Sequence, residues 1–267
     1  YRSRSEINEV VSRVMETQKP LYDFTAVDGI SHTVWKIADH KQVAQIQDTF
    51  ASINEIYIAD GHHRPASAVK VGLKRREEHP GYNGTEEFNY FLSVLFPDDQ
   101  LMIMDYNRVV KDLNGYSFQS FYKEMKKRFD VTEITDQEEK RPQEKGSFTM
   151  YMEGHWFLCK IREEDLAAVA DDPVKSLDVS LLHDLLLHPV LGIGDPKTDG
   201  RIDFVGGIRG MDELVRRCEE DCSVAFAMYP TSITELFSVA DAGKLMPPKS
   251  TWFEPKLRSG LFIHSLE

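Results

Sequence analysis

The chain has 267 residues, of which 41% are hydrophobic and 28% are charged, as in an ordinary globular protein of one or two domains. Its formal net charge of −12 argues against general binding to nucleic acids or anionic membranes, because an acidic surface repels phosphate. No apolar run approaches the roughly 20 residues that span a bilayer, and no signal peptide is visible, so we expect a cytoplasmic protein without nucleic-acid or membrane partners.

The three cysteines, Cys159, Cys218 and Cys222, are odd in number and sparsely spaced. They provide no disulfide framework, which favours a reducing compartment. Cys218 and Cys222 lie four residues apart, but no second Cys or His pair with ligand spacing accompanies them, so a structural zinc site is not expected.

The first half of the chain alternates predicted helices with short apolar segments. Ile7, Val10, Val11 and Val14 form an apolar stripe, which predicts a helix over residues 2–18. The next elements, in chain order, are expected to be strands 21–26 and 32–37 around a turn at 28–29, a helix over 41–50, an inner strand over 56–59, a helix over 65–76, and strands over 88–96 and 101–104.

The second half predicts a helix-flanked sheet. Its elements are expected to be a helix over 117–129, a charged loop over 135–145, a hairpin of strands 147–152 and 155–161, a helix over 177–187, a strand over 203–208, a helix over 211–222, a strand over 223–229 and a helix over 231–242. This order predicts an α/β or α+β fold with a mixed sheet. The charged loop predicts a subdivision near residues 130–146.

The segment between the predicted strand 56–59 and the predicted helix 65–76 contains several ionisable side chains. The connecting residues are Asp60, Gly61, His62, His63 and Arg64. A helix start offers unpaired N–H groups and a partial positive charge, Gly61 lets a ligand approach the main chain, and Arg64 can bind a phosphate bidentately. A plain turn needs only a glycine and one capping side chain, so this composition favours a phosphate site.

Arg108 and His183 are two further candidates. Arg108 follows the apolar strand 101–104 and is expected at a strand end, although a solvated surface arginine fits equally well. His183 lies in the predicted helix 177–187, where a structural histidine is a better match than a catalytic one.

The segment 246–256 is the second place where candidate ligand groups gather. It opens with two prolines, which disfavour a helix, and it carries anion-binding residue types at Lys249, Ser250, Thr251 and Lys256. The alternative is a proline-rich loop that packs Trp252 and Phe253 on the core. If the segment binds an anion, Lys249 and Lys256 are expected to approach the same cleft as Arg64.

Three strings of the sequence resemble the bacterial and archaeal family called domain of unknown function 1015. They are Asp60-Gly61-His62-His63-Arg64, Leu177-Asp178-Val179 and the stretch 246–256, and the resemblance extends over residues 21–262. Members of that family usually have a further amino-terminal region. The resemblance therefore implies that residues 1–267 are the carboxy-terminal part of a larger protein.

The string Gly61 to Arg64 is also similar, more loosely, to the phosphate-binding box of the ParB, sulfiredoxin and free-serine-kinase superfamily, in which a Gly-x-x-Arg turn holds nucleotide phosphates. Sulfiredoxins carry a reactive cysteine in this box, where the present sequence has His62 or His63, so reduction of a sulfinic acid is not expected. The basic DNA-binding module of ParB proteins is not visible. The glutamate base of the serine kinases comes from an amino-terminal segment that cannot be matched here.

These resemblances imply a phosphoryl-transfer enzyme that uses ATP or ADP and acts on a small hydroxylic metabolite such as serine or phosphoserine. The nucleotide phosphate would lie on Gly61 to Arg64, Mg²⁺ on Asp60, and the substrate against Lys249 and Ser250. Asp60 and either histidine of the turn are the candidate catalytic groups, since an imidazole can act as a general acid or base near neutral pH. A nucleotide-binding regulatory module without turnover is the main alternative, and a structural or interaction protein is the other.

Overall fold

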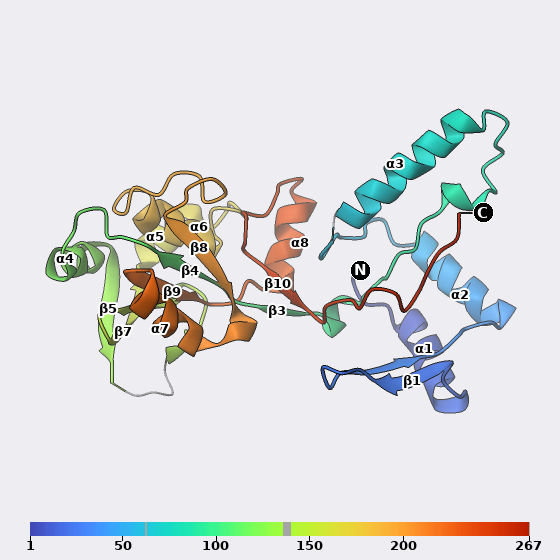
Figure 1. Ribbon diagram of the computed structural model, residues 1–267, viewed down its shortest axis with the longest axis horizontal. Helices are drawn as coiled ribbons and strands as arrows, with labels where there is room; N and C mark the ends of the chain where they lie inside the picture. The colour runs from blue at the N-terminus through green and yellow to red at the C-terminus, as the bar shows by residue number, and fades with distance from the viewer. Residues whose placement is uncertain (62, 136–139, 267) are drawn as a thin grey trace. The chain divides into compact units, whose positions relative to one another are not determined.

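A computed structural model describes residues 1–61, 63–135 and 140–266 (Figure 1). The chain forms two compact units, a smaller one of residues 1–101 together with the chain from Leu257 onward, and a larger one of residues 102–256. The expected subdivision near 130–146 falls within the larger unit, between two strands of the same sheet. None of the helices described is long and apolar enough to cross a membrane.

Among its described residues, the smaller unit contains three α-helices and one hairpin. Its elements are α1 (Ser5–Thr17), β1 (Tyr22–Thr25), β2 (Ser31–Val34), α2 (His40–Ala51), α3 (His63–Glu78) and the short 3-10 turns η1 (Glu87–Asn89) and η2 (Asp98–Gln100). The apolar stripe of α1 is buried at Ile7, Val10 and Val14, as its spacing predicts. The hairpin turns at Gly29, whose φ of 80° is accessible to glycine.

The predicted strands 56–59 and 88–96 are not formed. Neither segment pairs with another strand among the residues that the model describes. Ile56 and Ile58 are 60% and 65% exposed, whereas an inner strand would bury them. An apolar, β-branched composition favours a strand only where a neighbouring strand accepts its hydrogen bonds, so composition was misleading here.

The larger unit is built on a six-stranded sheet in the order β5-β7-β6-β9-β4-β8. The strands are β4 (Tyr106–Val110), β5 (Phe129–Ile134), β6 (Ser147–Met152), β7 (His155–Ile161), β8 (Ile202–Gly206) and β9 (Val224–Met228). A separate ladder joins β3 (Met102–Met104) to β10 (Trp252–Glu254). The expected α+β class with a helix-flanked sheet is confirmed, but every described ladder is antiparallel, which corrects the expectation of a mixed sheet.

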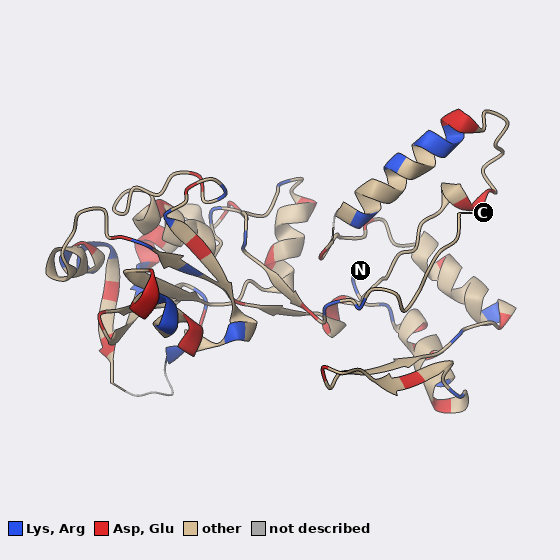
Figure 2. Ribbon diagram, viewed as in Figure 1, with Lys and Arg blue, Asp and Glu red and all other residues tan. Residues whose placement is uncertain are grey.

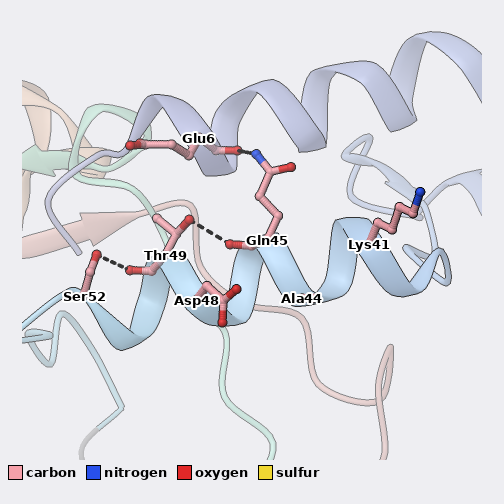
Figure 3. Close-up of a pocket in the computed structure, with 7 residues that line it drawn as sticks. All are labelled: Glu6, Lys41, Ala44, Gln45, Asp48, Thr49 and Ser52. Atoms are coloured by element: carbon pink, nitrogen blue, oxygen red, sulfur yellow. Dashed lines mark hydrogen bonds between the residues drawn. The ribbon is translucent and has the colours of Figure 1, made fainter.

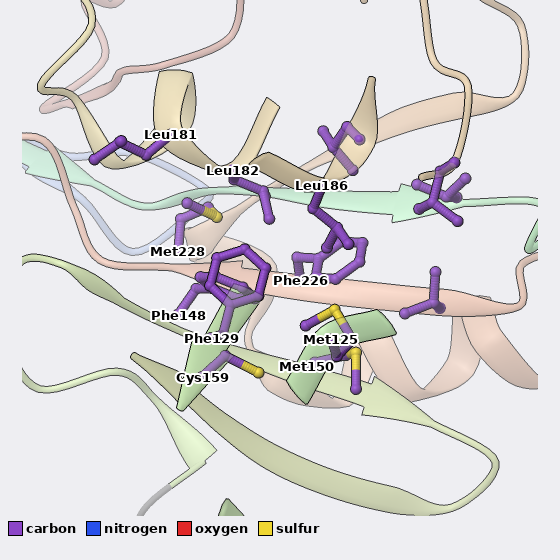
Figure 4. Packing of buried hydrophobic residues seen from close by; sticks show 14 of the residues in the cluster. Met125, Phe129, Phe148, Met150, Cys159, Leu181, Leu182, Leu186, Phe226 and Met228 are labelled. Carbon is purple, nitrogen blue, oxygen red and sulfur yellow. The ribbon is translucent and has the colours of Figure 1, made fainter. Parts of the chain in front are cut away.

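Helices cover both faces of this sheet. The helical segments of the unit are α4 (Phe118–Arg128), α5 (Glu163–Val169), α6 (Asp178–Leu182), which continues into a π-helical turn η4 (His183–Leu187), the 3-10 turn η5 (Gly207–Arg209), α7 (Met211–Glu220) and α8 (Ile233–Asp241). Phe148, Met150 and Phe226 pack with Leu182 and Leu186 on one face, which forms the main core (Figure 4).

The second face of the sheet follows from the alternation of side chains along each strand. Ala225 and Ala227, between the inward residues of β9, belong to a smaller apolar cluster with Leu214 of α7. The same alternation applies to β4, where Val109 joins the smaller cluster and Val110 joins the main core. Polar residues of β4 are therefore divided between the two faces.

Trp252 of β10 packs directly on the main chain of β8. A β-carbon added at Gly206 would lie 2.4 Å from the indole Cε3, closer than any real contact. The indole also makes an edge contact with the ring of Tyr106, 5.5 Å between centroids. Glycine at position 206 is therefore required for the segment 246–256 to lie on the sheet.

We expect Gly206→Ala to lower the free energy of unfolding by about 1–3 kcal/mol, because the added methyl group overlaps the indole. The measurement is urea denaturation followed by circular dichroism. Gly194→Ala is the matched control, since a β-carbon there meets open space among the described atoms and its stability should be unchanged or slightly higher. Equal losses in the two variants would contradict the packing of Trp252 on β8.

Asp178, from the Leu177-Asp178-Val179 string, is a buried carboxyl at the start of α6. It is 7% exposed, and its two oxygens accept the N–H of Gly146 at 3.1 and 3.0 Å. Burial, the largest cause, raises the pKa of Asp178 to about 7, although the Gly146 hydrogen bond and Lys145 oppose the change. The carboxyl therefore joins α6 to the loop before β6.

This pKa predicts a fall in stability between about pH 4 and about pH 7. In that window the folded protein holds a proton on Asp178 that the unfolded chain has released, so raising the pH favours unfolding. Asp178→Asn should flatten this part of the stability profile, because an amide does not titrate in this range. Its oxygen can still accept the Gly146 N–H, so the structural contact is kept. Urea denaturation at several pH values tests this, with the exposed Asp130→Asn as control. The same slope in wild type and Asp178→Asn would refute it.

Candidate functional site

The turn from Asp60 to Arg64 lies in the smaller unit. Gly61 has a φ of +76°, which side chains disfavour, and no described atom lies within 4 Å of the position that a β-carbon would take. Its N–H donates to Asp60 Oδ1 at 2.8 Å. Glycine is thus required by the backbone of the turn and leaves open space beside it. His62 lies outside the described residues, so its roles as phosphate ligand and general acid or base stay predictions.

The helix α3 begins at His63, two residues earlier than predicted, and therefore includes the last two residues of this turn. Pro65 is therefore its third residue and contributes no N–H, and the N–H of Arg64 donates to the Gly61 carbonyl at 3.0 Å. The first turn of α3 consequently offers fewer backbone donors than the sequence indicates. If the turn binds an anion as predicted, the helix dipole and the side chains of His63 and Arg64 have to supply more of the binding than the backbone donors do.

Arg64 carries an exposed guanidinium, whose Nη2 donates to Ser259 Oγ at 2.9 Å within the same unit. Further basic residues follow along α3, which Figure 2 shows in blue. Lys74 pairs with Glu78 at 3.7 Å, and Arg76 Nε donates to Asn89 at 2.7 Å. These later cations suit the carboxyl end of a helix, so a structural role explains them without a ligand.

Arg108 is in the middle of β4, not at a strand end, and it is only 4% exposed. Its Nη2 donates to the Lys249 carbonyl at 3.1 Å and its Nη1 to the Tyr106 carbonyl. No described carboxylate forms an ion pair with it, and its guanidinium lies 5.7 Å from the Phe204 ring centroid. Burial lowers the pKa of Arg108 to about 9. Arg108 is therefore not the solvated surface arginine that the sequence also allowed. Burying a cation is costly, and main-chain carbonyls offset part of that cost here.

The structure brings Lys249 next to Arg108, although the two are far apart in the sequence. Lys249 has a φ of +55°, and its Nζ lies 5.4 Å from the Tyr106 ring centroid. Ser250 is buried and donates to the Pro247 carbonyl at 2.6 Å, so its hydroxyl holds the turn. Lys256 Nζ lies 4.9 Å from the Trp252 ring centroid. These residues belong to the larger unit and Arg64 to the smaller one, so a shared cleft stays a prediction.

The sequence analysis did not single out two buried polar residues, Asp105 just before β4 and Asn107 within it, which lie on the second face of the sheet. Asp105 is 4% exposed and Asn107 is fully buried. Arg141 Nη1 donates to Asp105 Oδ1 at 2.9 Å, and Asn107 Nδ2 donates to Asp105 Oδ2 at 2.5 Å. The signal that could have found them is the pair of polar residues that interrupts an apolar strand at alternate positions. Arg141 lies in a charged loop, which carries no such signal.

His183 begins the π-helical turn that follows α6. Its Nδ1 is buried and has no hydrogen-bond partner among the described residues, and its ring lies 5.9 Å from that of His188. Burial is the main cause that lowers the pKa of His183, and the positive charge of Arg108 acts in the same direction. Both effects favour the neutral form of the imidazole.

A shallow hollow of about 560 Å³ lies between α1 and α2 (Figure 3). Its lining residues are Glu6, Lys41, Ala44, Gln45, Asp48, Thr49 and Ser52. The hydroxyls of Thr49 and Ser52 donate to carbonyls of their own helix, and Gln45 Nε2 donates to the Glu6 carbonyl at 3.3 Å. These side chains satisfy local helix groups, and none of the predicted site residues lines this hollow.

The described residues contain no group of three or more His, Cys, Asp or Glu side chains that could hold a metal ion. Asp60 would supply a single carboxylate. Mg²⁺ is commonly bound by one or two carboxylates together with substrate phosphates and water. A single carboxylate at Asp60 is compatible with that kind of binding, and the magnesium role of Asp60 stays a prediction.

Comparisons with solved structures give low similarity. A free serine kinase in complex with AMP is 14% identical, with a TM-score of 0.34, over 95% of this chain and 81% of that one. A mutant of a free serine kinase in complex with ADP has a TM-score of 0.35 at 14% identity over the same shares. A conserved hypothetical protein from Pyrococcus furiosus is 15% identical, with a TM-score of 0.35, over 93% of this chain and 82% of that one. At these scores the matches support no conclusion about ligands or reaction.

None of the curated proteins matches the sequence. The family model described as protein of unknown function (DUF1015) matches residues 1–180, which is more than half of the chain. The match includes the turn from Asp60 to Arg64 and the Leu177-Asp178-Val179 string, two of the three strings that carry the resemblance. The chain therefore belongs to the DUF1015 family of proteins of unknown function.

Proposed function

We propose that the turn from Asp60 to Arg64 binds the phosphates of ATP or ADP, and that the protein transfers a phosphoryl group to or from a small hydroxylic metabolite such as serine or phosphoserine. The observation that carries the proposal is the left-handed Gly61 two residues before α3, with the exposed guanidinium of Arg64 in the first turn of that helix. An open glycine, a helix start and an arginine are together the parts of a phosphate site.

The expected binding energy comes mainly from side chains. A helix N-terminus contributes about 0.3–1 kcal/mol to a bound anion, and a charge-assisted hydrogen bond about 1.5–3 kcal/mol. Because Pro65 and the bonded N–H of Arg64 reduce the number of backbone donors, the guanidinium of Arg64 is the largest single contributor in this proposal. The loose similarity to the phosphate box of ParB, sulfiredoxin and free-serine-kinase proteins supports the same assignment.

Phosphoryl transfer requires positioning and charge neutralisation more than covalent chemistry. We assign Asp60 to a magnesium ion that accompanies the nucleotide, and His62 or His63 to general acid or base catalysis. Bound Mg²⁺ would neutralise charge on the phosphates. We propose that three cations of the larger unit bind the anionic group of the metabolite, and that two hydroxyls donate hydrogen bonds to it. The cations are Arg108, Lys249 and Lys256, and the hydroxyls are those of Ser250 and Thr251. Ser250 would have to give up its bond to the Pro247 carbonyl.

A regulatory module that binds a nucleotide without turnover is the second candidate. It rests on the same turn and differs only in the absence of product. Incubation with ATP and serine, followed by phosphorus NMR, separates the two, because phosphoserine appears only if the protein is an enzyme.

We expect Arg64→Ala to weaken ATP binding by about tenfold to a hundredfold, because the variant loses the charge-assisted hydrogen bonds to phosphate. Calorimetric titration of ATP, ADP and phosphoserine into both proteins measures the change. Lys74→Ala removes the same charge from a later turn of the same helix and should bind ATP as wild type does. Equal affinities in wild type and Arg64→Ala, or no binding to either, would exclude a phosphate site at this turn.

A further inference from the structure

A hollow of about 360 Å³ in the larger unit has one charged wall and several apolar ones. Asp105 and Arg141 form the charged wall, and Pro142, Met211, Ala227 and Pro230 are among the apolar lining residues. Pockets that bind small molecules span roughly 300–1,000 Å³ and combine apolar walls with a few placed polar groups. This hollow lies near the lower end of that range, which favours a ligand of amino-acid size over a nucleotide.

The carboxylate of Asp105 is held in one orientation. Arg141 Nη1 donates to its Oδ1 at 2.9 Å, and Asn107 Nδ2 donates to its Oδ2 at 2.5 Å. Asn107 is itself oriented, because its Oδ1 accepts the N–H of Met228 at 2.9 Å. An amide whose oxygen accepts a main-chain N–H must turn its NH₂ group toward the carboxylate.

Gly207 shows that the main chain makes room for this carboxylate. A β-carbon at position 207 would lie 2.2 Å from Asp105 Oδ1, and the Gly207 N–H donates to the Asp105 carbonyl at 2.8 Å. Any larger residue would displace the charged group. The buried acid is therefore part of a built arrangement of β4, η5 and the loop that contains Arg141.

Both charged groups line the hollow, and their bonds to described residues leave some of their hydrogen-bonding capacity unused. Arg141 has five N–H donors and a side chain that is 44% exposed, and it donates to Asp105 and, at 3.4 Å, to the Gly207 carbonyl. A carboxylate has about four acceptor positions, of which Arg141 and Asn107 use two. A ligand in the hollow can therefore contact the exposed guanidinium, and it meets the small exposed part of the carboxylate that lines the same wall.

We infer that this hollow binds an α-amino acid with an apolar side chain, its carboxylate on Arg141 and its ammonium group on Asp105. The Asp105–Arg141 pair is neutral overall, so a ligand with one charge would leave that charge unbalanced in a partly buried place. A zwitterion balances both partners, and its side chain would contact Met211 and the neighbouring prolines, Pro142 and Pro230. The inference goes beyond the proposed function and does not depend on the turn at Arg64.

The test uses three ligands of nearly the same shape, titrated by calorimetry into the whole protein. Leucine carries both charges, 4-methylpentanoate only the carboxylate and 3-methylbutylamine only the ammonium group. Leucine should bind at least about tenfold more tightly than either analogue, a difference that one lost charge pair readily produces. Equal binding of leucine and the acid, or no binding of leucine, would overturn the inference.

Two variants locate the site. Arg141→Gln should weaken leucine binding by about tenfold or more, whereas Arg209→Gln, which removes the same charge outside the lining, should not change it. Met211→Trp fills the hollow without altering charge and should also prevent binding. Circular dichroism confirms that each variant is folded. Unchanged leucine binding in Arg141→Gln would refute the assignment, and ATP titration of that variant separates this result from failure of the phosphate site.

Discussion

The pairing of β4 with both β8 and β9 is the constraint on which the polar arrangement of the larger unit depends. A strand bonded on both sides cannot turn its side chains away from the faces that alternation assigns to them. Arg108 consequently lies on the face of the main core, where main-chain carbonyls hold it. Asn107, and Asp105 just before the strand, lie on the opposite face, beside the hollow that Arg141 completes.

Two side chains of the larger unit, Asp105 and Trp252, pack so closely on the main chain that only glycine fits beside them. Asp105 requires glycine at 207, and the indole of Trp252 requires glycine at 206. The two glycines therefore have different functions, one beside a charged group and the other beneath an aromatic ring. A buried guanidinium on β4 and a buried carboxylate just before it destabilise the fold unless each keeps its hydrogen-bond partners.

In the smaller unit, the candidate site residues are exposed, in contrast to the buried polar groups of the larger unit. The turn from Asp60 to Arg64 lies at an exposed helix start, supported by local bonds from Gly61 to Asp60 and from Arg64 to Ser259. Few residues around it are buried. A ligand at this place would meet side chains that water also reaches, which favours a charged, hydrated group such as phosphate over an apolar one.

The sequence by itself determined the elements that depend on local interactions. These elements are the apolar stripe of α1, the hairpin turn at Gly29, the hairpin of β6 and β7, and the helix α8, and they involve residues that are close in the chain. The glycine–arginine turn before α3 was also recognisable, because backbone angle and helix start are local properties.

Only the tertiary structure decided which apolar segments became strands and which charges became buried. Residues 56–59 and 88–96 have strand-like composition but no described partner, while β4 pairs with strands that lie much later in the chain. Arg108 looked like a surface or strand-end residue, and Arg141 like part of a charged loop, until their neighbours were known. The physical reason is that a ladder partner or a counter-charge from a distant segment leaves no trace in the local pattern.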